Sequence, residues 1–99
     1  MESQSVPAEL LAAREQIDQI DRQIIDLLAQ RFALTHRVGL LKASNALEAL
    51  DASREAEKLA EITRICEAHD LNAALVTDLF SRIMEEVVRN HKRLREQQK

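Results

Sequence analysis

One uninterrupted helical stretch, from Ala8 to about Ala43, constrains this chain more than any other feature. The stretch contains no proline and a single glycine, Gly39, and most of its residues are strong helix formers. Its apolar residues recur at alternating spacings of three and four, which is typical of one apolar seam along a helix. The seam consists of Leu10, Ala13, Ile17, Ile20, Ile24, Leu27, Leu34, Val38 and Leu41.

The length of this helix predicts a dimer. A helix of roughly 35 residues is about 50 Å long, whereas a compact domain of about 100 residues has a radius of gyration near 13 Å. The remainder of a 99-residue chain is too small to cover the whole seam. We therefore expect a second copy of the chain to cover it, in a helical homodimer.

Arg31 interrupts the seam, because it stands between Leu27 and Leu34 where the spacing calls for an apolar residue. Burying a charged side chain is costly unless the charge is paired. One interpretation is a buried ion pair with an acidic residue of a facing helix. The other is that Arg31 faces an anionic ligand inside the helical bundle.

Two further helices are predicted, so we expect an all-α fold with three helices per chain. The length of the chain suits one domain over residues 1–99. Ser44–Ser53 loses the helical period and is expected to form a loop, with Asp51 or Ser53 capping the next helix. That helix should run from about Arg54 to Ala68, with Leu59, Ile62 and Cys66 inward. The last should run from about Ala73 to Arg95 after an Asn72 cap. Residues 1–7 and 96–99 are expected to fray.

The apolar face of the third helix ends in a histidine. It consists of Val76, Leu79, Phe80, Ile83, Met84, Val87 and Val88, and His91 continues the row.

Composition excludes several classes of protein. The chain has one glycine, one proline and 2% aromatic residues, which argues against a β-sandwich or barrel. Its formal charge of −3 argues against a general nucleic-acid binder. It has no apolar run long enough to span a bilayer, and its first residues do not resemble a signal peptide. Cys66 is the one cysteine, so we expect a reduced core thiol and a cytoplasmic protein.

The sequence offers neither a metal motif nor a nucleophilic triad, and we expect no metal and no cofactor. His36, His69 and His91 are scattered rather than spaced as metal ligands. What remains is a set of cations in unusual places: Arg14, Arg31, Lys42 and Arg54.

The spacing of these cations suits a small dicarboxylate. Arg31 and Lys42 are eleven positions apart, close to three whole turns, so they point the same way. Arg14 is about 25 Å from Arg31 along the same helix and cannot reach that position within one chain. An antiparallel partner could bring its own Arg14 there. The alternative is that these charges only solvate a long helix or form ion pairs.

Several segments of the sequence resemble a known protein family. The chain contains LLAAREQIDQID, LLAQR, RVGLLK and DASRE, followed by Leu79, Phe80 and Ile83 in the third helix. These segments, from about Leu10 to His91, are similar to the all-helical bacterial chorismate mutases and align without a gap. The order of the arginines, the Val-Gly pair, the lysine and the Asp-x-x-Arg-Glu group is much more specific than any single basic residue. The resemblance implies a monofunctional, single-domain member that forms an intertwined homodimer with two active sites.

The resemblance also assigns roles by position. Arg14 of one protomer would bind a carboxylate in the other protomer's site, Arg31 would bind the side-chain carboxylate, and Lys42 would reach a carboxylate and the ether oxygen. Arg54 would help to hold the substrate, Glu55 would accept from the ring hydroxyl, and Asp51 would lie beside it. Val38 and Val87 would line the pocket.

Two positions depart from the family. The family member with which the chain aligns, the mutase domain of the bacterial enzyme fused to prephenate dehydratase, has Ser where this chain has Val87, which removes one polar contact. It has Gln where this chain has His91, so the second donor to the ether oxygen changes chemistry. A neutral imidazole still donates one proton. Because nearby cations disfavour an imidazolium, we expect the neutral form to work.

The implied activity is the rearrangement of chorismate to prephenate in phenylalanine and tyrosine biosynthesis, without a metal or a covalent intermediate. One alternative is an isochorismate pyruvate lyase, which shares the fold and a similar cation set. Glu55 argues against the lyase, because that position serves the hydroxyl of chorismate. Another alternative is a non-catalytic helical dimerisation module, in which the cations make ion pairs or face water.

Overall fold

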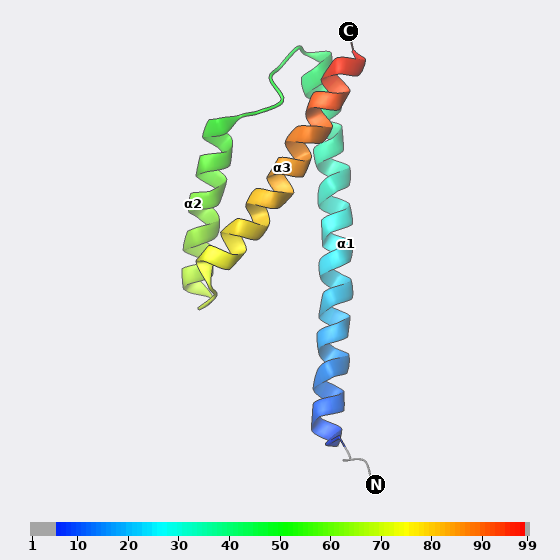
Figure 1. Cartoon of the computed structure of the whole chain (residues 1–99), viewed down its shortest axis with the longest axis vertical. Helices are drawn as coiled ribbons and strands as arrows, with labels where there is room; N and C mark the ends of the chain where they lie inside the picture. Colours follow the sequence, from blue (N-terminus) through cyan, green and yellow to red (C-terminus); the bar gives the residue numbers. More distant parts are fainter. Residues whose placement is uncertain (1–5, 99) are drawn as a thin grey trace. The chain divides into compact units, whose positions relative to one another are not determined.

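The computed structural model describes residues 6–98, and these are helical with short connections. It contains the helices α1 (Ala8–Ser44), α2 (Ala52–Ala68) and α3 (Ala73–Gln97), and no strand occurs among the described residues (Figure 1). The all-α prediction with three helices and a long first helix is therefore confirmed. The expectation that the ends fray falls largely on residues 1–5 and 99, which lie outside the described part of the chain.

The chain divides into two compact units. The N-terminal unit, Met1–Ala33, contains the first part of α1. The C-terminal unit, Leu34–Lys99, contains the end of α1, the connector between α1 and α2, and the helices α2 and α3. The single-domain arrangement predicted from the length stays a prediction.

Within the N-terminal unit, the apolar seam of α1 is only partly covered. Leu10, Ile17, Ile20, Ile24 and Leu27 are between 42% and 61% exposed. Soluble proteins rarely expose a continuous apolar stripe of this kind unless it binds something. The seam is therefore apolar and exposed, as we expect of a surface that contacts another molecule.

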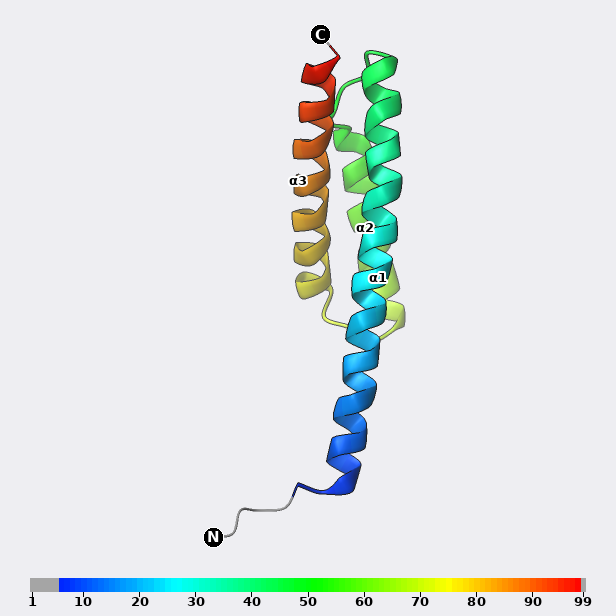
Figure 2. The same ribbon diagram turned by 90° about the vertical axis from the view of Figure 1, so that its right-hand side faces the viewer.

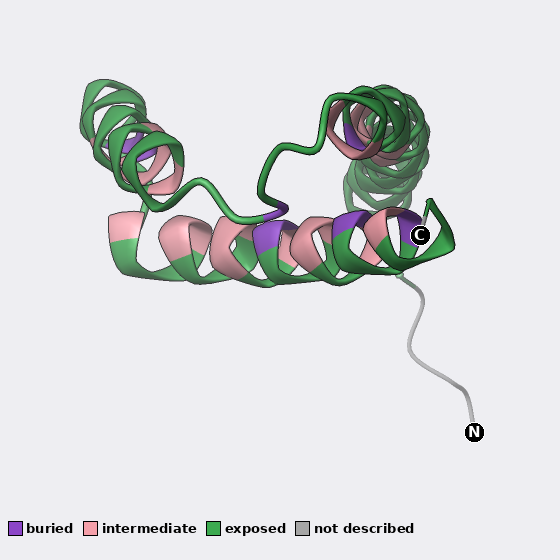
Figure 3. Cartoon of the chain, turned by 90° about the horizontal axis from the view of Figure 1, so that it is seen from above, coloured by how far each residue is buried: buried purple, intermediate pink, exposed green. Residues whose placement is uncertain are grey.

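Within the C-terminal unit, α2 and α3 pack against each other, and a short turn, visible at the lower end of α3 in Figure 2, joins them. Buried and half-buried residues follow one side of α3, as Figure 3 shows. The inward positions predicted for Ile62, Cys66 and Met84 are confirmed, since all three are buried. Leu79 differs, because half of its surface is exposed.

The helix boundaries follow capping chemistry. The Asp51 carboxylate accepts a hydrogen bond from the Arg54 amide at 3.0 Å and caps α2. Of the two predicted caps, Asp51 is therefore the one in use, and Ser53 lies in the first turn. Asn72 caps α3 as predicted. α3 continues to Gln97, so the helix includes two residues of the segment 96–99 that we expected to fray.

The described helices include none that is long and apolar enough to cross a membrane.

Candidate active site

Lys42 lies in the last turn of α1 and is half-buried. Its ammonium Nζ donates a hydrogen bond to the backbone carbonyl of Ala49, 3.2 Å away, in the connector. Ala49 is buried, with 7% of its surface exposed. The connector is thus tied back onto α1 by a cation that retains two more N–H groups, because an ammonium has three donors.

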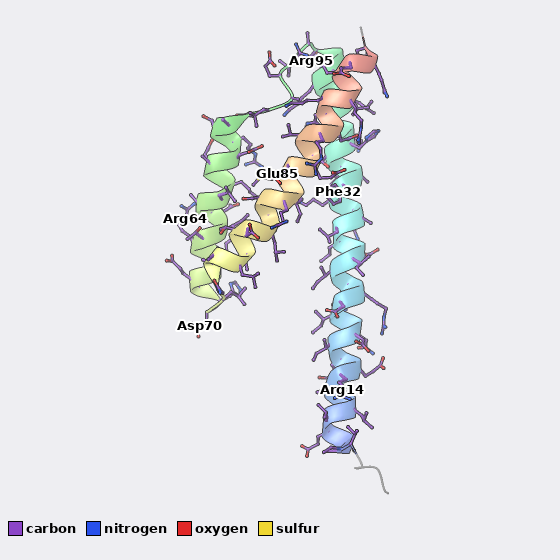
Figure 4. The ribbon with its side chains drawn as sticks, viewed as in Figure 1. Arg14, Phe32, Arg64, Asp70, Glu85 and Arg95 are labelled. Carbon is purple, nitrogen blue, oxygen red and sulfur yellow. The ribbon has the colours of Figure 1, made fainter. Side chains whose placement is uncertain are left out.

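Arg95 holds the same connector from α3. Its guanidinium donates to the backbone carbonyl of Leu47 and lies 3.8 Å from the carboxylate of Glu48. Figure 4 shows Arg95 in the last turns of α3, near the connector. The connector is therefore fastened to α1 and to α3, although it has no helix or strand of its own.

The connector leads directly into the first turn of α2, which contains three predicted site residues. The Asp51 side chain is used by the helix cap, so its position is set by the backbone. Arg54 is exposed and Glu55 is half-buried. Glu55 at a helix N-terminus is favoured by the helix dipole, whereas Arg54 is not. The helix dipole therefore gives no reason for the placement of Arg54 in this turn.

His91 is buried in the C-terminal unit, with 4% of its surface exposed. Its Nε2 atom lies 2.7 Å from the backbone carbonyl oxygen of Thr35 on α1. A carbonyl only accepts, so Nε2 carries the proton and donates. The neutral ring has a single N–H, and this bond uses it. The predicted role of His91 as a donor to a substrate oxygen stays a prediction.

Gly39 explains how the imidazole reaches this position. A Cβ atom on residue 39 would lie 2.5 Å from Cδ2 of His91 and 2.8 Å from Cδ1 of Leu94. Glycine in a helix interior is about 1 kcal/mol less favourable than alanine, so its presence in α1 needs such a packing reason. The sequence signal was present, since Gly39 is the only glycine of the chain. Its partner across the helices was not predictable from spacing.

A second hydrogen bond joins the same two helices. The amide Nδ2 of Asn90 donates to Nδ1 of His36 at 3.1 Å. Sequence reasoning missed Asn90 and Thr35, because a backbone acceptor and an amide on a polar face carry no pattern of their own. Val87, one turn before His91, is half-buried, and Val38 is 43% exposed.

Arg14 and Arg31 belong to the N-terminal unit. Arg31 is half-buried, which agrees with its place in the apolar seam, and Arg14 is exposed. Both lie on α1, and Arg14 is labelled near the start of that helix in Figure 4. At 1.5 Å per residue they are about 25 Å apart. One chain therefore does not bring these two arginines together.

The predicted site residues are thus divided between the two units. Arg14 and Arg31 are in the N-terminal unit, and the C-terminal unit contains Val38, Lys42, Asp51, Arg54, Glu55, Val87 and His91. Among residues 6–98, no group of three or more His, Cys, Asp or Glu side chains is placed to hold a metal ion.

Among the described residues, one titratable group outside this set, Glu61, has a shifted pKa. A hydrogen bond from Lys58 lowers the pKa of the Glu61 carboxyl, at an N–O distance of 3.0 Å. The side chains of Lys58 and Glu61 are 31% and 50% exposed, so this is an ordinary surface ion pair.

The candidate residues offer positive charge and hydrogen-bond donors. An ammonium, guanidinium groups and a buried imidazole can hold carboxylates and stabilise negative charge that develops on an oxygen. Glu55 adds one acceptor for a hydroxyl group. This chemistry suits a small, doubly negative ligand.

Comparison with known proteins places the chain in a family. The sequence profile described as chorismate mutase type II matches residues 13–92. The chain is 39% identical over 79 residues to the T-protein of Enterobacter agglomerans, covering 80% of this chain and 21% of that protein. It is 35% identical over 88 residues to the bifunctional chorismate mutase/prephenate dehydratase of Escherichia coli K12, covering 89% of this chain and 23% of that enzyme.

The chain spans between a fifth and a quarter of the length of these two relatives. The profile nevertheless covers most of the 99 residues, from the first turns of α1 almost to the end of α3. It includes every residue of the candidate site from Arg14 to His91. The chain therefore belongs to the chorismate mutase type II family.

Proposed function

We propose that this protein is a chorismate mutase, which rearranges chorismate to prephenate in the biosynthesis of phenylalanine and tyrosine. The observation that carries the proposal is the half-buried Lys42, held in the last turn of α1 against the connector that leads to Arg54 and Glu55. Membership of the family supports it, as do relatives such as the bifunctional chorismate mutase/prephenate dehydratase. The cytosol is the proposed compartment, because a lone reduced thiol suits a reducing environment.

The reaction needs no proton transfer and no covalent enzyme intermediate. The ether C–O bond of chorismate breaks as a new C–C bond forms, and all the electrons involved remain within the substrate. The enzyme must hold the folded conformer and stabilise the negative charge that builds on the ether oxygen as C–O cleavage runs ahead. Fixed cations can do both, by orienting the carboxylates and by meeting the developing charge.

Each candidate residue then has a role in this scheme. Arg31 and the Arg14 of a second chain clamp the two carboxylates, and Lys42 reaches a carboxylate and the ether oxygen. Glu55 accepts from the ring hydroxyl, with Asp51 beside it and Arg54 helping to hold the substrate. Val38 and Val87 supply apolar walls, and His91 is the second donor toward the ether oxygen.

We propose that the active unit is an intertwined homodimer with shared sites. The support is the seam of α1, whose apolar residues remain about half exposed in a single chain. Covering each such side chain would contribute about 1 kcal/mol, and a second α1 running antiparallel is the simplest cover of matching length. The distance between Arg14 and Arg31 supports the same arrangement, because one chain cannot bring both to one dicarboxylate.

A product assay tests the proposal. The purified chain is incubated separately with chorismate and with isochorismate, and the products are identified by chromatography. Prephenate from chorismate is the expected result. Pyruvate released from isochorismate, with no prephenate from chorismate, would favour the lyase, and no product from either would favour a non-catalytic dimerisation module.

A further inference from the structure

The turn that ends α1 is closed by two backbone hydrogen bonds. The amide of Leu47 donates to the carbonyl of Lys42 at 2.8 Å. The amide of Ala46 donates to the carbonyl of Ala43 at 3.2 Å. These two bonds form a Schellman motif, a common helix end in which the residue at the position of Ala46 adopts a left-handed backbone conformation. The turn therefore sets the direction in which the connector leaves α1.

Ala46 occupies this left-handed position, with φ at 55°. Glycine is the usual residue there, because a Cβ atom makes the conformation unfavourable. The one glycine of the chain is Gly39, inside α1. The side chain of Ala46 is exposed, so packing of its methyl group does not offset the cost. A residue held in such a conformation needs neighbouring contacts to keep it there, and residues of this kind cluster at functional sites.

The contacts of the turn converge on Lys42. Its backbone carbonyl accepts from the amide of Leu47, and its ammonium Nζ donates to the carbonyl of Ala49 at 3.2 Å. One short segment of the connector therefore binds both the backbone and the charged end of the same residue. A lysine side chain has a flexible four-carbon stem, so its ammonium keeps one direction only where a bond holds it. The left-handed turn at Ala46 brings the Ala49 carbonyl within reach of that ammonium.

The end of α2 provides an internal comparison, because it has the same turn. The amide of Leu71 donates to the carbonyl of Cys66 at 2.9 Å. The amide of Asp70 donates to the carbonyl of Glu67 at 3.4 Å, and φ of Asp70 is 58°. Aspartate tolerates the left-handed conformation better than alanine, because its side chain can hydrogen-bond locally. None of the candidate site residues lies in this second turn.

We propose that Ala46 is a positioning residue for the mutase reaction. Its left-handed backbone places the connector so that the Ala49 carbonyl holds the Lys42 ammonium ready for the charge that develops on the ether oxygen. This inference rests on the proposed function. Donors that are fixed before the reaction stabilise developing charge best, because they do not have to reorganise. With one N–H bound to Ala49, the ammonium retains two for the substrate.

Substitutions at position 46 test the proposal. Valine is branched at Cβ and strongly disfavours the left-handed conformation, whereas glycine adopts it freely. Ala46→Val should lower kcat with chorismate by about tenfold or more, with a smaller change in KM, because the displaced ammonium is missed mainly in the transition state. Ala46→Gly should retain the wild-type kcat and raise the urea midpoint of unfolding.

Asp70→Val is the matched control, since it places the same side chain in the same turn at the end of α2. Both valine variants should lower the urea midpoint, but only Ala46→Val should lower kcat. Circular dichroism verifies that each variant is folded before rates are compared. An equal loss of kcat from the two variants would show that a weakened helix end accounts for the effect, and it would overturn the positioning role.

A double-mutant cycle identifies the residue through which Ala46 acts. In a Lys42→Ala background, Ala46→Val should have little further effect on kcat, because no ammonium is left to position. If Ala46→Val caused its full loss of kcat in that background as well, the turn would act through some other group and the proposal would be wrong.

Ala46→Leu and Asp70→Leu make the same comparison if the valine variants do not fold, because leucine is bulky but not branched at Cβ. Prephenate formed with the wild-type kcat by every folded variant at position 46 would overturn the positioning role and leave the proposed function intact. The absence of prephenate from the wild-type protein would instead overturn the proposed function itself.

Discussion

The ammonium of Lys42 donates to the backbone carbonyl of Ala49 across 3.2 Å, so one side chain joins the last turn of α1 to the connector that leads into α2. The same side chain is the one that we propose to meet the ether oxygen of the substrate. A substitution of Lys42 therefore removes a charge and a structural tie together, and the two effects have to be separated experimentally.

Lys42→Ala should reduce kcat far more than it raises KM. The hydrogen bond to the ether oxygen strengthens as negative charge develops, so its loss is felt mainly in the transition state. Removing one such donor typically costs about 3–4 kcal/mol, or 10²–10³ in rate. Steady-state kinetics with chorismate measures the effect. A variant whose kcat stays within tenfold of the wild type would remove Lys42 from this role.

Arg95→Ala is the matched control for the structural tie. Arg95 also holds the connector, through Leu47 and Glu48, but it is not among the proposed ligands of the substrate. We expect its kcat to remain within a few-fold of the wild type. If Arg95→Ala lost as much activity as Lys42→Ala, the connector rather than the ammonium would account for the loss.

Arg14→Ala and Arg31→Ala homodimers should each be nearly inactive and should complement each other when mixed. In a heterodimer of the two, one site contains both arginines and the other contains neither. An equal, fully exchanged mixture of two-fold symmetric dimers should therefore recover about a quarter of wild-type activity. Native mass spectrometry verifies the exchange. Proven exchange without recovery would mean that Arg14 acts within its own chain or has no role.

Ile24→Glu should disrupt the dimer. Ile24 lies in the middle of the α1 seam and is 50% exposed in the single chain. A second chain over that seam would bury the new carboxylate, which costs several kcal/mol without a partner. Light scattering at micromolar concentration should give a dimer for the wild type and a smaller or unfolded species for the variant.

Gln23→Glu provides the control for the added charge, because Gln23 is exposed and is not a member of the seam. It should remain dimeric. If the wild-type protein proved to be a folded, active monomer, the proposal of a homodimer would be wrong.

Asp51→Ala should destabilise the fold by about 1 kcal/mol, the usual cost of losing an N-cap. The Asp51 carboxylate accepts from the Arg54 amide at 3.0 Å, and asparagine at this position can accept in the same way. Asp51→Asn should therefore retain most of the stability. Urea denaturation measures the difference, with Ser53→Ala as the control at the predicted cap that α2 does not use. Equal destabilisation by the two alanine variants would contradict the capping assignment.

The sequence alone was sufficient to predict the three helices and the Asn72 cap, whereas it left Asp51 and Ser53 as alternatives for the cap of α2. Helical periodicity, the capping residues Asp51 and Asn72, and a chain with one glycine and one proline leave little alternative to three helices. These features are local, because a cap or an apolar face depends on residues within a few positions of one another. The end of α3 was less certain, since no residue after Arg95 stops a helix.

The candidate site was predicted as a set of positions rather than as a set of contacts. Charge in unusual places indicated Arg14, Arg31, Lys42 and Arg54, and the resemblance to the family added Glu55 and His91. Nothing in the sequence indicated that the connector would be fastened by Lys42 and Arg95, because both bonds end on backbone carbonyls. Every residue has such a carbonyl, so no residue type distinguishes Ala49 or Leu47.

His91 shows the division most clearly. The sequence determined that a histidine ends the apolar row of α3 and that one glycine lies within α1. Only the tertiary structure decided that the two meet, that the Thr35 carbonyl accepts a hydrogen bond from Nε2–H, and that Nδ1 is buried without a hydrogen-bond partner among the described residues. The physical reason is that residues 35 and 91 are 56 positions apart. Packing of α3 against the end of α1 brings them together, and no local periodicity encodes which atoms will then face each other.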